Sequence, residues 1–253
     1  MFAQERQKEI ADSIKETGRV QVNDLAEKYH VTKDLIRKDL NVLEQQGLLK
    51  KVYGGAVAVR ENLHEYSSAS RKERNPEGRE EIARKAVSLI HNNETIFLDI
   101  SLTSVKIAEL LVKSNLSVHV ITNMLEVLNV LAPDKKTDVF FPGGTLNQER
   151  DGFWSALTIR NLSVCHIDKA FLGTVGIDLN KNTVSTYHES DGELKRKVMS
   201  LSSESYALAD SHKFHEDGDY TYASVSDFTA LITDSLLDES DKNKLGKEDV
   251  SIL

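Results

Sequence analysis

Apolar residues at helical spacing, separated by short polar breaks, organise the N-terminal quarter of the chain. Ile10 and Ile14 predict a helix over 4–16, and Gly18 follows as a helix-ending glycine. Residues 19–22 then read as a short extended piece. The pattern therefore begins as a helix followed by a strand, each too short to fold without neighbours.

Two further helices follow at close spacing. Asn23 is placed to cap a helix that carries Leu25 among its apolar residues, and Thr32 is placed to cap a helix over roughly 33–46 that Gly47 ends. In the last of these helices Ile36, Leu40 and Leu43 form an apolar stripe at i, i+4 and i+7. Its other side carries Lys33, Asp34, Arg37, Lys38 and Asn41.

A basic hairpin follows the third helix directly. Residues 48–53 and 56–59 are strand-like, and Gly54-Gly55 supplies the positive φ of a two-residue turn. A capped helix with a cationic face beside such a hairpin is typical of a helix that enters the DNA major groove next to a wing. The residues we expect to contact DNA are Thr32, Lys33, Asp34, Arg37, Lys38, Lys50, Lys51 and Tyr53. The alternative is an ordinary solvated helix face.

The rest of the chain changes character twice. Residues 60–79 are polar and charged and read as a linker, in part helical, so we expect a DNA-binding domain at 1–59 and a second domain at 80–253. In the second domain short apolar runs alternate with helical segments, which predicts an α/β fold with a mostly parallel sheet covered on both faces. The runs are 96–98, 118–121, 139–141, 170–172, 206–208 and 230–232, and the helical segments are 104–113, 124–132, 153–162 and 190–203.

Small and polar residues gather where these predicted strands end. Ligands of parallel sheets bind at the carboxyl ends of the strands, and the amides of small-residue loops that open helices bind anions. A phosphorylated or polyhydroxylated small molecule is therefore favoured there over simple turns. The candidate effector-binding residues are Asp99, Ser101, Thr103, Ser104, Asn123, Gly143, Gly144, Glu189 and Lys213.

Charge is distributed unevenly along the chain. The formal net charge is −8, yet residues 1–60 carry 11 Lys and Arg against 9 Asp and Glu. The N-terminal head, residues 1–60, is therefore weakly basic, and the rest of the chain is acidic. Cys165 is the single cysteine, which excludes an internal disulfide framework and favours a reducing compartment. No apolar run approaches a membrane span and no export signal is evident, so we expect a cytoplasmic protein.

Several other features favour structural roles. His188, His212 and His215 lack a third ligand at zinc-site spacing, so we expect no metal site. Cys165 and Trp154 read as packing residues. No phosphate-binding loop or dinucleotide fingerprint is present, and we expect no cofactor.

The residues resemble the DeoR family of bacterial transcriptional regulators over essentially the whole chain. The motifs that carry the resemblance are Ile36-Arg37-Lys38-Asp39-Leu40, Tyr53-Gly54-Gly55-Ala56, Phe97-Leu98-Asp99, Gly143-Gly144-Thr145 and Asp210-Ser211-His212-Lys213-Phe214. The resemblance implies a winged helix-turn-helix joined to a Rossmann-like, ribose-5-phosphate isomerase-like sensor domain that has lost catalysis. It also implies a repressor of sugar or polyol catabolism that binds operator DNA as a homodimer or homotetramer and is released by a phosphorylated sugar.

The chain departs from the family pattern at two places. Thr32, Lys38, Lys51 and Tyr53 stand where the family usually has Ser, Arg, Arg and His, which leaves the operator sequence open because lysine lacks the bidentate reading of arginine. The loop 99–104 lacks the usual glycine and threonine. Two alternatives stay open: a sugar-phosphate isomerase or deaminase activity resting on Asp178, Glu189 and Lys213, and a protein effector.

Overall fold

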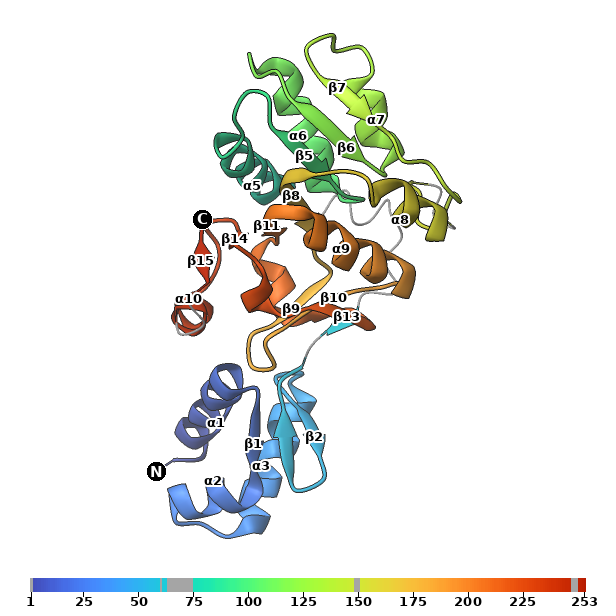
Figure 1. The fold of residues 1–253 in the computed structure, drawn as a ribbon. Helices are drawn as coiled ribbons and strands as arrows, with labels where there is room; N and C mark the ends of the chain where they lie inside the picture. The colour runs from blue at the N-terminus through green and yellow to red at the C-terminus, as the bar shows by residue number, and fades with distance from the viewer. Residues whose placement is uncertain (1, 60, 63–74, 148–150, 247–249) are drawn as a thin grey trace. The chain divides into compact units, whose positions relative to one another are not determined.

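The computed structural model describes residues 2–59, 61–62, 75–147, 151–246 and 250–253. The chain divides into two compact units, Met1–Glu61 and Asn62–Leu253. Figure 1 shows the elements of both units, and each unit is described by itself. Within the described residues, no helix is both long and apolar enough to cross a membrane.

The first unit is a three-helix domain with a small sheet. Its elements are α1 (Ala3–Thr17), β1 (Arg19–Gln21), α2 (Val22–Tyr29), α3 (Lys33–Gln45), β2 (Lys50–Val52) and β3 (Gly55–Val57). The strands are antiparallel in the order β1-β3-β2, so β3 lies between β1 and its hairpin partner β2. The core is formed by Ile10, Ile14, Val22, Leu25, Ala26, Ile36, Leu40, Leu43, Leu49 and Ala56. This confirms the apolar stripe predicted for the third helix.

Two local predictions in this unit are wrong. Helix α2 begins at Val22 after Gln21, so Asn23 lies inside its first turn and does not cap it. The chain passes directly from β1 into α2 because the backbone N–H of Val22 donates to the carbonyl of Gly54, at 2.9 Å. In the hairpin only Gly54 has a positive φ, of 82°. Gly55 is needed for a different reason, since a Cβ there would lie 2.0 Å from the carbonyl oxygen of Val20.

The second unit is built on a seven-stranded parallel sheet in the order β15-β14-β11-β8-β5-β6-β7. Its strands are β5 (Thr95–Leu98), β6 (His119–Thr122), β7 (Asp138–Phe140), β8 (Ile167–Gly173), β11 (Ser202–Leu208), β14 (Ala230–Ile232) and β15 (Ser251–Ile252). Six of these match the six predicted apolar runs. The chain leaves β5 towards β7 and returns to β8 on the other side of β5, so the strand order reverses between β5 and β8.

Helices cover both faces of this sheet (Figure 1). The helices of the unit are α5 (Pro76–Ser88), α6 (Leu102–Lys113), α7 (Leu125–Leu131), α8 (Ala156–Leu162), α9 (Glu189–Leu201), the 3-10 turns η1 (Ser211–His215) and η2 (Val225–Asp227), and α10 (Glu239–Leu245). Ile96 and Leu98 of β5 pack with α5, α6 and α7, whereas Phe97 between them packs with α8 and α9. The alternation of strand side chains thus produces two apolar layers.

Short strands outside the parallel sheet have no counterpart in the prediction. β9 (Gly176–Asp178), β10 (Thr183–Thr186) and β13 (Tyr220–Ala223) form an antiparallel sheet in the order β13-β10-β9. β4 (Glu61–Asn62) and β12 (Glu216–Asp217) are two residues each. Each of these strands is too short for a period of two to stand out in the sequence.

The first described helix of the second unit begins inside the predicted linker. Helix α5 starts at Pro76, and Asn75 caps it with φ 46° while its side chain accepts from the N–H of Gly78 at 3.1 Å. The Asn75 amide also donates to Asp234, at 2.7 Å, which fixes the cap to the end of β14. Most of the predicted linker, residues 60 and 63–74, lies outside the described residues.

Candidate DNA interface and effector site

Helix α3 presents the predicted reading face to solvent. The hydroxyl of Thr32 accepts from the backbone N–H of Leu35, at 3.3 Å, which is the predicted cap. The four side chains of the first two turns that we expected to contact DNA are all exposed: Lys33, Asp34, Arg37 and Lys38. Because the opposite stripe is buried, packing against the core fixes the direction in which these side chains project.

Arg37 is held in a weak exposed ion pair. Its Nη1 lies 2.7 Å from Oδ1 of Asp34, and the two side chains are 59% and 82% exposed. An ion pair this open to water contributes little to stability. The guanidinium is therefore free to exchange Asp34 for a phosphate or a base edge at small energetic cost.

The basic hairpin is tied to α3. The backbone N–H of Lys51 donates to Oε1 of Glu44, at 2.8 Å, and its ammonium donates to Asn41. Lys50 is exposed, and Tyr53 is fully exposed at the tip of the hairpin beside Gly54. Two cations and an aromatic ring thus project from a hairpin whose register to α3 is fixed by hydrogen bonds.

A buried ion pair connects α3 to α1. Nε of Arg6 lies 2.6 Å from Oδ2 of Asp39, with side chains 5% and 4% exposed, and the amide of Gln7 donates to Oδ1 at 2.8 Å. Asp39 sits beside Leu40 on the buried side of α3, where an unpaired carboxylate is costly. The pair therefore joins α3 to α1 on the side of α3 opposite its exposed cationic face.

At the carboxyl edge of the large sheet, Asp99 lies where the strand order reverses. It follows β5 directly and is 1% exposed. One carboxylate oxygen accepts from the backbone N–H of Gly173 at the end of β8, at 2.7 Å, and the other accepts from the hydroxyl of Ser104, at 2.9 Å. Open α/β sheets bind ligands at this kind of reversal.

A buried lysine, Lys195, places a positive charge beside Asp99 at this edge of the sheet. Nζ of Lys195, from α9, lies 3.2 Å from Asp99 and 3.1 Å from Asp191, and it donates to the carbonyl of Gly173 at 2.6 Å. Burial alone would lower the pKa of Lys195, but Asp191 and Asp99 outweigh burial and raise that pKa above its ordinary value. The ammonium also lies 5.4 Å from the ring centre of Tyr222.

The Lys195 cluster includes further buried polar atoms. The hydroxyl of Thr186 donates to Asp191 at 2.6 Å. The hydroxyl of Tyr222 is buried without a hydrogen-bond partner, and burial raises the pKa of Tyr222 above its ordinary value. Lys195 is therefore a fixed cation at neutral pH, with carboxylates and hydroxyls around it.

The loop after Asp99 forms the start of α6. Ser101 caps the helix and accepts from the N–H of Ser104, at 3.1 Å, and Thr103 and Ser104 are buried. Ser101 also lies against the end of β8, since a Cβ at Gly173 would be 2.5 Å from that of Ser101. The predicted residues of this loop are thus brought together with Asp99 around one helix N-terminus.

Two neighbouring loops meet this edge. Asn123, after β6, donates to the carbonyl of Phe153 at 2.9 Å, while its buried Oδ1 has no hydrogen-bond partner. A Cβ at Gly152 would touch both Ile100 and the carbonyl of Asn123, so the three loops are in contact. Gly143 and Gly144 have φ of 65° and 129° and lie on the loop that follows β7. The hydroxyl of Thr158 holds that loop by donating to the carbonyl of Gly143, at 2.8 Å.

The two remaining predicted effector residues, Glu189 and Lys213, lie on α9 and η1. Glu189 is exposed at the first position of α9. Lys213 lies in η1 with its ammonium 2.7 Å from Oε2 of the buried Glu216, so its charge is already paired. Asp178, a residue of the enzymatic alternative, caps a turn by accepting from the N–H groups of Asn180 and Lys181.

Lys195 and Asp191 are functional candidates that the sequence analysis missed. They lie at i and i+4 in α9, a spacing that usually marks an exposed ion pair. A signal was nonetheless present, because Leu194 and Val198 occupy the same face. Charged residues that interrupt the apolar stripe of a helix indicate a buried polar cluster.

The architecture defines a regulator with a winged helix-turn-helix and a separate α/β domain. Residues 6–62 match the DeoR-like helix-turn-helix domain, and residues 74–235 match the DeoR C terminal sensor domain. The chain belongs to the DeoR family of transcriptional regulators.

Three transcriptional regulators are similar to this chain over nearly its whole length. The chain is 32% identical to the HTH-type transcriptional repressor GlcR of Bacillus subtilis (strain 168) over 255 residues, which covers 100% of this chain and 96% of the relative. It is 31% identical to a lactose phosphotransferase system repressor of Streptococcus mutans, covering 98% of each. It is 30% identical to an L-fucose operon activator of Haemophilus influenzae, covering 91% of this chain and 92% of the relative.

Solved structures share a partial likeness. A ribose 5-phosphate isomerase A from Methanocaldococcus jannaschii is 16% identical, with a TM-score of 0.42 over 55% of each chain.

Proposed function

We propose that this protein represses a carbohydrate or polyol catabolic operon by binding its operator through α3 and the β2–β3 hairpin. A small phosphorylated sugar, bound at the carboxyl edge of the large sheet, controls that binding. Repression is favoured over activation because the GlcR and lactose phosphotransferase system relatives are named repressors, whereas the L-fucose operon relative is named an activator. This role places the protein with the chromosome in the cytoplasm.

The observation that carries the DNA-binding half is the exposed, cationic face of α3. Arg37 and Lys38 project from the helix side opposite the core, and Lys50 and Lys51 extend the positive charge onto the hairpin. Lysine and arginine at these positions suit phosphate contacts, and Arg37 suits bidentate contact with a guanine. We propose Thr32, Lys33, Asp34 and Tyr53 as the remaining contacts.

The effector half is supported by the polar groups around Asp99. A sugar phosphate needs a cation or helix amides for its phosphate and carboxylate or amide oxygens for its hydroxyls. The start of α6 supplies the helix amides, and Asp99 and the unpartnered Oδ1 of Asn123 supply oxygens for the hydroxyls. Lys195 is already paired with Asp99 and Asp191, so its part is to hold Asp99 in place. Of the other predicted residues, Gly143 and Gly144 are proposed to let the loop after β7 approach the ligand.

Control of DNA binding follows from a difference in ligand affinity between two states. An inverted or direct repeat is read by two heads, so the spacing between the heads in a homodimer or homotetramer decides the fit. A ligand shifts that spacing only if it binds one arrangement more tightly than the other. We propose that the sugar phosphate favours the arrangement that does not fit the operator.

Fluorescence anisotropy on DNA from upstream of the protein's own and neighbouring genes tests the first half. Arg37→Ala should abolish specific binding, while Lys8→Ala, an exposed cation on α1, serves as the matched control and should bind as the wild type does. Retained affinity in Arg37→Ala would exclude α3 as the reading helix.

A thermal-shift screen of sugar phosphates on the full chain tests the proposed effector site. A shift lost in Asn123→Ala supports the effector site, and no shift with any compound points to a protein effector.

A further inference from the structure

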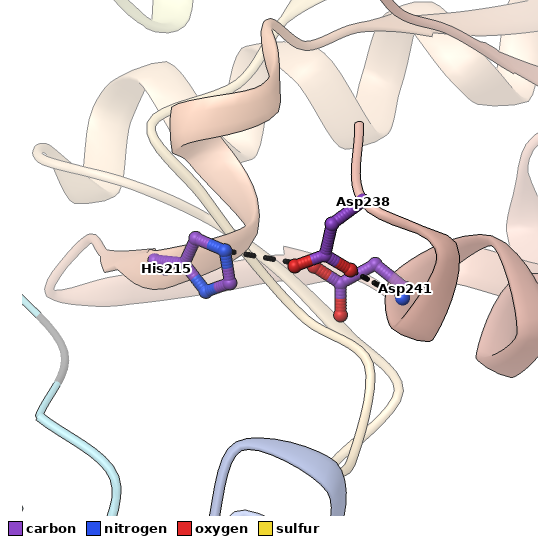
Figure 2. Close-up of side chains that lie close together, drawn as sticks. All are labelled: His215, Asp238 and Asp241. Carbon is purple, nitrogen blue, oxygen red and sulfur yellow. Dashed lines mark hydrogen bonds and ion pairs between the residues drawn. The ribbon is translucent and has the colours of Figure 1, made fainter. Parts of the chain in front are cut away.

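Three side chains of metal-ligand type meet at a point that the proposed DNA and effector functions do not use. His215 ends η1, and Asp238 and Asp241 lie at the start of α10, more than twenty positions further along the chain. One potential ligand atom from each residue lies within 4.8 Å of the other two. Figure 2 shows the imidazole of His215 directed at the two carboxylates.

The clearest sign of a missing ligand is on Asp241. Its side chain is 8% exposed, and its Oδ2 is buried without a hydrogen-bond partner. Nε2 of His215 is 3.6 Å from this oxygen, which is too long for a hydrogen bond. Buried carboxylate oxygens are almost always satisfied by donors or by a cation. An unsatisfied oxygen that faces an imidazole nitrogen marks a gap that a cation would fill.

The other contacts of the two carboxylates leave this gap open. Asp238 accepts from the backbone N–H of Asp241 through Oδ1, at 2.9 Å, which leaves Oδ2 for a ligand. Lys244 lies 3.6 Å from Oδ1 of Asp241, on the oxygen that does not face His215.

We propose that His215, Asp238 and Asp241 bind one divalent transition-metal ion, with Zn²⁺ as the best match. An imidazole nitrogen selects against Mg²⁺ and Ca²⁺, which prefer oxygen ligands alone, and one nitrogen with two carboxylate oxygens suits zinc. Water completes the coordination. The ion joins η1 to α10 and so fixes the C-terminal helix against the segment that carries Lys213. The sequence analysis expected no metal because no third ligand stood at zinc-site spacing to the histidines, whereas both carboxylates of this group lie more than twenty positions after His215.

Metal titration of the full chain tests this proposal. After chelator treatment and dialysis, isothermal titration with Zn²⁺ and absorption spectroscopy with Co²⁺ should show one bound ion per chain in the wild type. His215→Ala and Asp238→Asn should each weaken binding by about tenfold or more, because loss of a ligand costs at least as much as loss of an outer hydrogen bond to a ligand. The Asp238→Asn variant should still fold, because asparagine caps a helix about as well as aspartate does.

His212→Ala is the matched control, since it removes an exposed histidine three positions from His215 and should leave binding unchanged. Equal Zn²⁺ affinity in the wild type, His215→Ala and Asp238→Asn would overturn the proposal. Zinc X-ray absorption on the wild type gives a readout that needs no variant. One imidazole with oxygen ligands at about 2.0–2.2 Å is expected. A sulfur ligand or two imidazoles would place the ion elsewhere and refute the site.

Discussion

The buried pair between Arg6 and Asp39 allows the sharpest test of how α3 is held. In Arg6→Met the Asp39 carboxylate stays buried and keeps only the hydrogen bond from Gln7. Removal of one partner of a buried ion pair costs about 3–5 kcal/mol. For a domain of this size about 1 kcal/mol shifts the thermal midpoint by some 4–8 °C, so the head should unfold more than about 12 °C earlier.

Hydrogen exchange of the full chain, followed by mass spectrometry, measures this effect on α1 and α3 separately from the second unit. Arg37→Met is the control, because it breaks an exposed ion pair on the same helix and should cost less than about 1 kcal/mol. The double variant Arg6→Met/Asp39→Leu removes both charges and should recover most of the stability. Equal, small effects of Arg6→Met and Arg37→Met would refute the assignment of the buried pair as the tie between α1 and α3.

Three further predictions concern the rest of the molecule. Lys195→Met leaves two carboxylates buried without their cation and should lower the free energy of unfolding of the second unit by about 3–5 kcal/mol, measured by urea denaturation. Gly55→Ala places a Cβ 2.0 Å from the carbonyl of Val20 and should destabilise the hairpin by roughly 2 kcal/mol, seen as faster amide exchange in β2 and β3. Burial alone would raise the pKa of Glu94, but Lys169 and a backbone N–H lower it overall. The stabilisation by Glu94 is therefore present above about pH 4.3 and lost as pH falls through the folded pKa, so Glu94→Gln should cost more at pH 7 than at pH 3 in thermal denaturation.

Each of these predictions has a contradicting outcome. Unchanged urea midpoints in Lys195→Met would mean that water or rearrangement compensates the carboxylates. Wild-type exchange rates in Gly55→Ala would mean that the hairpin accommodates a methyl group. A pH-independent effect of Glu94→Gln would show that the charge of Glu94 contributes nothing to folding.

The features that the sequence predicted are those that depend on local pattern. The cap by Thr32 and the stripe of Ile36, Leu40 and Leu43 follow from residues within one helix, and the structure confirms them. All six apolar runs became strands of one sheet, and most of them are buried, as expected of a parallel sheet covered on both faces, whereas β7 at the sheet edge is largely exposed. Local pattern was misleading at Asn23, because α2 begins one residue earlier at Val22, whose N–H donates to the hairpin carbonyl of Gly54.

The features that the sequence could not predict depend on which elements meet. Lys195 reads as half of a surface ion pair until α9 is placed on the sheet beside Asp99. Lys213 reads as a free cation until Glu216, three positions on, is found buried next to it. The group of His215, Asp238 and Asp241 arises because η1 and α10 meet in the fold, and no spacing in the sequence indicates it.

The most direct test of the central proposal is the anisotropy of labelled upstream DNA with the full chain as sugar phosphates are added one at a time. The account predicts salt-sensitive, specific binding that at least one sugar phosphate weakens while leaving non-specific binding unchanged. Failure to bind upstream DNA more tightly than unrelated DNA, or specific binding that no phosphorylated sugar alters, would contradict it.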